Sequence, residues 1–117
     1  MSTNYIDHHH LLYPRTGWNY GFAKKLRTHA YLIVELPRNL HEAIHASVPY
    51  IPVASGNVSS AAIEKLAFLR ETGVIKGNDS PVKRLSALIG IFEELDPDIA
   101  YALDAQLKIV CKFNSLH

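Results

Sequence analysis

Seven histidines occur in the sequence, and two groups of them have a spacing suited to metal binding. His41 and His45 are four residues apart in a segment predicted to be helical. At about 3.6 residues per turn, this spacing places both imidazoles on one face of the helix. His9 and His10 lie about thirty residues upstream, and a metal site needs such ligands from a distant segment. We therefore predict a histidine metal site divided between these two segments, with His8 as an exposed neighbour.

The helical pair also matches the pattern His-Glu-x-x-His, in which zinc peptidases use the glutamate as general base. Here that glutamate is Glu42, between His41 and His45. Pro49 ends the helix soon afterwards, and Glu64, placed where some of these enzymes have a third ligand, is expected to be a solvated helix residue. A zinc peptidase is thus a third interpretation, which leaves the upstream histidines unexplained.

Two strands and a short helix are expected to position the histidines. Residues 5–13 are rich in β-branched, aromatic and histidine residues and end in breakers at 14–17, so they predict a strand and a turn. Residues 22–28 predict one or two helical turns, and residues 31–36 predict a second strand that Pro37 ends. Asn39 is the expected cap of a helix that continues through Ser47.

The remainder of the chain predicts three helices, at residues 59–72, 80–95 and 98–113, after a loop at 50–57. Apolar residues recur in each at helical spacing, which indicates a buried core or a dimer face. Neither half is large enough to fold well alone. We therefore expect an α+β fold in one domain, residues 1–117, with a strand-strand-helix unit (1–48) packed against a helical part (58–117).

Composition excludes several classes of protein. Apolar residues make up 48% and charged residues 20%, the balance of a globular domain. The longest apolar stretches, 30–36 and 87–92, are far shorter than the roughly 20 residues that cross a bilayer. The N-terminus lacks the basic and apolar regions of a secretory signal, so an intracellular, cytoplasmic protein is expected. Cys111 is the one cysteine, which leaves no disulfide within the chain.

Both histidine groups together resemble a known motif: a His-His pair soon followed by a proline, then a strand, then a helix with His-x-x-x-His. This order is similar to that of HNH endonucleases of the ββα-metal group, in particular the colicin-type DNases, over residues 5–48 only. The resemblance implies hydrolysis of phosphodiester bonds in DNA with one divalent metal ion, such as Zn, Ni, Mg or Mn. Carried over to this sequence, the family's roles would make His9, His41 and His45 the metal ligands and His10 the general base.

This assignment is chemically coherent. Phosphodiester hydrolysis needs a base that deprotonates water and a cation that stabilises the developing charge, and a neutral imidazole is a suitable base near pH 7. Three histidine ligands leave a coordination position for water or phosphate. Replacing His10 by alanine should then abolish metal-stimulated cleavage while the fold is kept.

The sequence departs from the family at two places. The asparagine that usually orients the base would fall on Leu32, so His29 or Asn39 is expected to replace it. The paired cysteines of many family members, which bind a structural zinc, are absent, and the added helices are expected to brace the unit instead. A second interpretation therefore stays open: a catalytically inactive, HNH-like metal-binding protein that acts as a protein-binding or inhibitory module.

Charge indicates where nucleic acid would bind. Net charge is only +1, but residues 1–48 carry five basic and three acidic side chains, and the remainder carries seven and eight. Arg15, Lys24, Lys25 and Arg27 are the candidates for contacts with the DNA backbone, which would be sensitive to salt and insensitive to sequence. A protein partner or a second copy is expected at the C-terminal helices.

Overall fold

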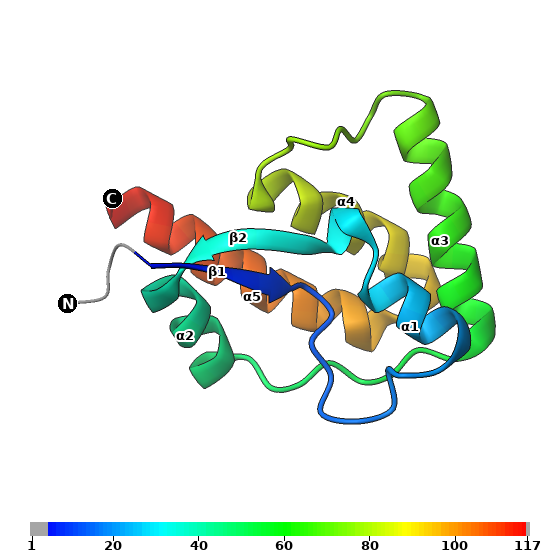
Figure 1. Ribbon diagram of the computed structural model, residues 1–117, viewed down its shortest axis with the longest axis horizontal. Coiled ribbons are helices and arrows are strands. Elements are labelled where there is room, and N and C mark those ends of the chain that lie inside the picture. The colour runs from blue at the N-terminus through cyan, green and yellow to red at the C-terminus, as the bar shows by residue number, and fades with distance from the viewer. Residues whose placement is uncertain (1–4, 117) are drawn as a thin grey trace.

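The computed structural model describes residues 5–116 and arranges them as two strands and five helices (Figure 1). In chain order these are β1 (Ile6–His10), α1 (Gly21–Arg27), β2 (Ile33–Pro37), α2 (Arg38–Ser47), α3 (Gly56–Glu71), α4 (Pro81–Leu95) and α5 (Pro97–Leu116). A short 3-10 turn at Ala30–Leu32 leads into β2. The predicted α+β class, with a strand-strand-helix unit followed by helices, is confirmed.

β1 and β2 pair antiparallel, with Asp7 opposite Leu36 and His9 opposite Val34. Successive side chains of a strand point to opposite faces. Val34 and Leu36 are buried, so Asp7 and His9 lie on the inner face of the sheet. β1 ends at His10 and does not continue to residue 13 as predicted. The next three residues are all buried, and three consecutive buried side chains are incompatible with a strand that has one solvent face.

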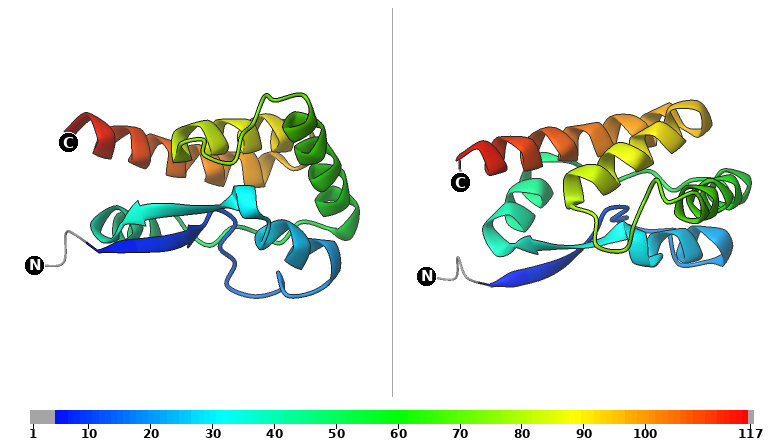
Figure 2. Two further views of the ribbon diagram at one scale, coloured as in Figure 1. Left: turned by 45° about the horizontal axis from the view of Figure 1, so that its top comes forward. Right: turned by 90° about the horizontal axis from the view of Figure 1, so that it is seen from above.

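Helices α4 and α5 form one layer and the sheet forms the other, with α2 and α3 at opposite ends (Figures 1 and 2). α5 packs along α4 and against α2, while α3 packs against α1. The core runs through both layers, and Trp18 and Phe92 are its largest fully buried side chains. Within residues 5–116, no helix has the length and apolarity needed to cross a membrane.

Local signals set the starts of the helices. The Ser80 hydroxyl accepts a hydrogen bond from the Lys83 amide at the start of α4, and Pro81 occupies its first turn, as predicted. α3 begins at Gly56 because Ser55 caps it in the same way. Pro37, and not Asn39, precedes the first residue of α2, which has no side-chain cap.

Candidate metal centre

Three histidines converge on the inner side of the sheet. His9 comes from β1, and His41 and His45 come from consecutive turns of α2. One ring nitrogen of each lies within 4.8 Å of the others, and the three rings contact one another with centroids 4.6 to 5.3 Å apart. The predicted convergence of these three side chains is confirmed, and we call them the histidine cluster. They lie close enough to bind one metal ion.

The backbone explains why the histidine cluster forms. β2 passes into α2 without a loop, because Pro37 ends the strand and Arg38 begins the helix. The Arg38 amide donates to the Tyr5 carbonyl at 2.9 Å, which ties the start of α2 to the start of β1. α2 therefore lies against the inner face of the sheet, with the face bearing His41 and His45 turned toward β1.

His9 is the buried member of the histidine cluster, with 1% of its surface exposed. Its Nε2 lies 2.8 Å from Gln106 Oε1, and the Gln106 amide nitrogen donates to the Leu11 carbonyl at 2.9 Å. A carbonyl only accepts hydrogen bonds, so the amide nitrogen of Gln106 must face Leu11 and its oxygen must face His9. Nε2 therefore carries the proton of the neutral ring, and Nδ1 carries the lone pair.

That lone pair has no partner within residues 5–116, although Nδ1 is buried. Buried polar atoms are nearly always paired, so an unpaired one needs an explanation. Burial also lowers the pKa of His9 to about 4, which keeps the ring neutral at physiological pH. A neutral, buried imidazole nitrogen beside two other imidazoles has the chemistry of a metal ligand.

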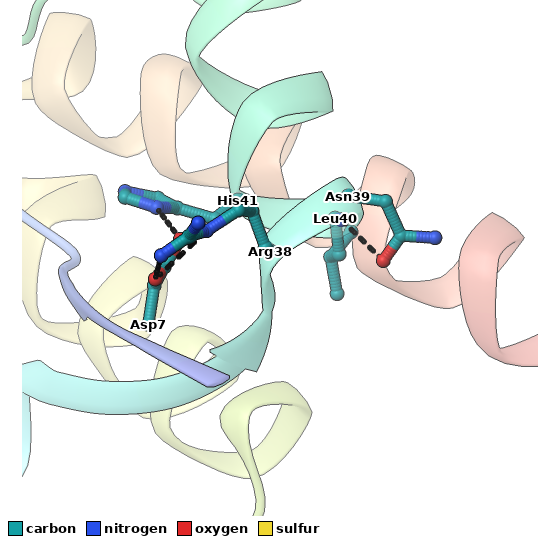
Figure 3. A network of polar contacts seen from close by, with 5 residues as sticks. All are labelled: Asp7, Arg38, Asn39, Leu40 and His41. Carbon is teal, nitrogen blue, oxygen red and sulfur yellow. Dashed lines mark hydrogen bonds and ion pairs between the residues drawn. The ribbon is translucent and has the colours of Figure 1, made fainter. Parts of the chain in front are cut away.

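His41 is oriented by a carboxylate. Its Nδ1 donates to Asp7 Oδ2 at 3.0 Å, and Arg38 Nη2 donates to the other oxygen of Asp7 at 3.1 Å (Figure 3). These two hydrogen bonds lower the pKa of Asp7, so the carboxylate is ionised. Metal-binding histidines commonly donate their second ring nitrogen to a carboxylate, which leaves Nε2 for the ion.

His45 forms the solvent side of the cluster. It is exposed, and its ring packs on that of Tyr13 with centroids 4.4 Å apart. The Tyr13 hydroxyl donates to the Val48 carbonyl at 2.7 Å, which fixes the tyrosine ring at the end of α2. Partial burial, followed by the charge of His41, lowers the pKa of His45. The cluster therefore combines a buried anchor, His9, with a side open to solvent.

This donor set suits a mid-sized divalent ion. Imidazole nitrogens are ligands for Zn, Ni, Cu and Fe, and three protein ligands leave at least one position for water or substrate. A tetrahedral zinc ion would hold its nitrogens about 3.4 Å apart. Since the nitrogens here are separated by up to 4.8 Å, metal binding would have to shorten the longest of these separations by about 1.4 Å.

No family model matches the chain. Among curated proteins and solved structures there is likewise no significant match. Any function must therefore be inferred from the chemistry of the centre itself.

His10, the predicted general base, lies outside the histidine cluster. Alternation along β1 puts its side chain on the outer face of the sheet, opposite to that of His9. Partial burial and the positive charge of Arg27 lower its pKa there. The outer face also holds His8, whose Nε2 lies 3.5 Å from Glu35. The histidine cluster thus does not include His10, and its role as general base stays a prediction.

The two residues expected to orient His10, His29 and Asn39, each form a hydrogen bond with the backbone of their own segment. The His29 ring accepts a hydrogen bond from the Tyr31 amide, which begins the 3-10 turn before β2. The Asn39 side chain accepts from the Leu40 amide and points away from the Asp7 carboxylate (Figure 3). Within residues 5–116, no hydrogen bond joins either side chain to His10.

The remaining predicted residues lie outside the histidine cluster. Arg15, Lys24 and Lys25 are exposed, whereas Arg27 donates to the Trp18 carbonyl and to Asn19. Glu42 and Glu64, which the peptidase interpretation uses, are both exposed. The third histidine-cluster member is His9 and not Glu64.

Sequence reasoning missed Asp7 and Gln106, the two residues that orient the histidine rings. Asp7 had a usable signal, because residues two apart on a strand share a face and Asp7 precedes His9 by two. Gln106 lies 97 residues from His9 in the chain, and only the tertiary packing of α5 brings it there.

Proposed function

We propose that the chain is a metal-dependent hydrolase of phosphodiester bonds in nucleic acid, with one divalent ion bound by His9, His41 and His45. The observation that carries the proposal is the buried, unpaired Nδ1 of His9 beside two further imidazoles, one of them open to solvent. The strand-strand-helix order around this cluster supports the resemblance to HNH endonucleases.

The chemistry follows from the donor set. Imidazole ligands are neutral, so the bound ion would keep its double positive charge, attract a phosphate and lower the pKa of bound water. His9 would anchor the ion, and His45 would border the side from which water and substrate enter. Because His10 lies on the other face of the sheet, we do not use it as the base. A bound ion would lower the pKa of the attacking water, and its proton would pass to bulk solvent on the open side of the cluster.

The test is nicking of supercoiled plasmid after removal of metal with a chelator and addition of Zn, Ni, Mg or Mn separately. His45→Ala should lose both metal-stimulated nicking and stoichiometric metal. His8→Ala is the control, because His8 is on the same strand as the proposed ligand His9 but its side chain is 70% exposed on the outer face. This variant should bind metal and nick plasmid as the parent protein does. His10→Ala should also retain cleavage, and its loss would restore His10 as the base.

A second candidate is a metal-binding module without catalysis that acts through a protein partner. One observation favours it: α3 and α4 border an apolar groove of about 360 Å³ with Phe68 and Val74 exposed at its edge. Tight, stoichiometric metal with no nicking under any of the four ions would favour this candidate. Absence of metal binding would contradict both.

A further inference from the structure

The segment between the two strands has an unusual charge. Residues 8–34 contain no acidic side chain, and within them residues 14–27, here called the basic segment, carry Arg15, Lys24, Lys25 and Arg27. Clustered positive charge without neighbouring carboxylates attracts polyanions. The basic segment is therefore the part of the chain where a nucleic acid would be held most strongly.

One of the four basic side chains forms hydrogen bonds within the basic segment, and the other three do not. Arg27 is committed, because its guanidinium donates to the Trp18 carbonyl and to Asn19. Arg15, Lys24 and Lys25 are exposed, and within residues 5–116 none of them pairs with a carboxylate. Three cations thus remain free to contact phosphates.

Two aromatic rings accompany these cations. Tyr20 is 80% exposed and Phe22 is 46% exposed, and the ammonium group of Lys25 lies 5.3 Å from the centre of the Phe22 ring. Trp18 holds the segment in place, because it is fully buried and its Nε1 donates to the Ile51 carbonyl at 3.2 Å. Gly21, at φ +56°, lets the chain turn from Tyr20 into α1.

The basic segment is continuous with the metal centre. It begins at Pro14, directly after Tyr13, whose ring packs on that of His45. A polymer bound along the segment toward its first residues would approach the open side of the histidine cluster.

We propose that Tyr20 and Phe22, together with Arg15, Lys24 and Lys25, form a binding surface for single-stranded nucleic acid. Unpaired bases expose flat faces that stack on aromatic side chains, while the phosphates follow the positive charge, and such binding tolerates many sequences. Duplex DNA offers the same phosphates but keeps its base faces stacked internally. That this nucleic acid is also the substrate rests on the proposed function. Binding at this surface needs no metal and can be tested separately.

The test is fluorescence anisotropy of a labelled oligothymidylate of about 12 nucleotides, recorded in a chelator so that no cleavage occurs. Tyr20→Ala and Phe22→Ala should each weaken binding by about 5- to 100-fold, and Tyr20→Phe should restore it because the ring is kept. Lys24→Gln should weaken binding more in low salt than in high salt. Oligouridylate in place of oligothymidylate tests whether RNA is bound as well as DNA.

Matched controls are available on the other helices. Tyr101 on α5 is also 80% exposed but lies beside Glu93 and Asp104. Lys65 on α3 is an exposed lysine outside the basic segment. Tyr101→Ala and Lys65→Gln should therefore leave the affinity for the oligonucleotide unchanged. Equal loss in Tyr101→Ala and Tyr20→Ala would overturn the proposal. So would duplex binding as tight as single-strand binding, or binding to phosphatidylserine vesicles without binding to the oligonucleotide.

The design separates this proposal from the metal centre. His45→Ala in the same assay should bind the oligonucleotide as the parent protein does, although it loses metal. If the parent protein binds the oligonucleotide but nicks no DNA with any of the four metal ions, the proposed function fails and the binding surface stands. If the parent protein binds metal and nicks plasmid while Tyr20→Ala binds the oligonucleotide normally, the binding surface fails and the proposed function stands.

Discussion

Replacing Gln106 by methionine should weaken metal binding more than any other single change outside the three ligands. Methionine keeps the unbranched shape and buried volume of glutamine but provides no acceptor for His9 and no donor for the Leu11 carbonyl. Without that acceptor, the proton of His9 is free to move to Nδ1, and the lone pair needed for the metal is lost. Removing such orienting contacts typically lowers metal affinity by about 10- to 100-fold.

The same change should also lower stability in the metal-free protein. It leaves two buried polar groups unpaired, each costing about 1 to 3 kcal/mol, so a loss of about 2 to 6 kcal/mol in unfolding free energy is expected. Domains of this size have total stabilities of about 5 to 15 kcal/mol, so Gln106→Met stays folded when the parent protein is more stable than about 6 kcal/mol. Urea unfolding in a chelator measures the loss.

Two further variants separate the tautomer argument from general destabilisation. Leu103→Ala removes a fully buried side chain one turn away on α5 and should cost about 2 to 5 kcal/mol while leaving the zinc affinity of the folded protein unchanged. Gln106→Glu keeps an acceptor for His9, so affinity should stay within a few-fold of the parent. Competition with a chromophoric chelator gives the affinities. Parent-like zinc affinity in folded Gln106→Met, or a nitrogen NMR spectrum that places the His9 proton on Nδ1, would refute the reasoning.

Three other predictions address pH, the carboxylate and the loop. Burial lowers the pKa of His9 to about 4, so between pH 6.5 and pH 4 the unfolded chain binds a proton at His9 and the folded chain does not. The stability of the metal-free protein should therefore fall by about 3 kcal/mol as the pH falls from about 6.5 to about 4, and then level off. A urea-unfolding profile that is flat over this pH range would contradict the prediction. Asp7→Asn should lower zinc affinity about tenfold, because the anionic acceptor of His41 is lost; the same chelator competition checks it. Gly17→Ala should cost about 1 to 2 kcal/mol in thermal unfolding, since Gly17 has φ +88° and a Cβ would lie 2.8 Å from Val53.

The helical part of the fold was predictable because its signals are local. Ser80-Pro81 marks the start of α4 and Pro97 the start of α5, and the observed helices agree with the predicted ones within three residues at each end. The strand ends were less predictable. Residues 11–13 have the composition of a strand, but they turn into the core together, and propensity carries no information on such tertiary packing.

Part of the candidate metal centre could also be predicted from the sequence. The spacing of His41 and His45 fixes their common face without any tertiary information. Alternation along β1 also separates His9 from His10, so the outward position of His10 follows from the strand prediction itself. The family resemblance favoured a role for His10 as general base, which stays a prediction, since His10 lies outside the histidine cluster.

Gln106 shows what a single sequence contains but does not reveal. It lies three residues after Leu103 and four before Val110, two buried members of the apolar stripe of α5, so a polar residue interrupts a core face at helical spacing. A buried amide requires hydrogen-bond partners, and this requirement was visible in the sequence. Its partners were not, because they lie across the core on the N-terminal strand-strand-helix unit. The helical part is therefore more than a brace, since α5 sets which nitrogen of His9 is available to a metal.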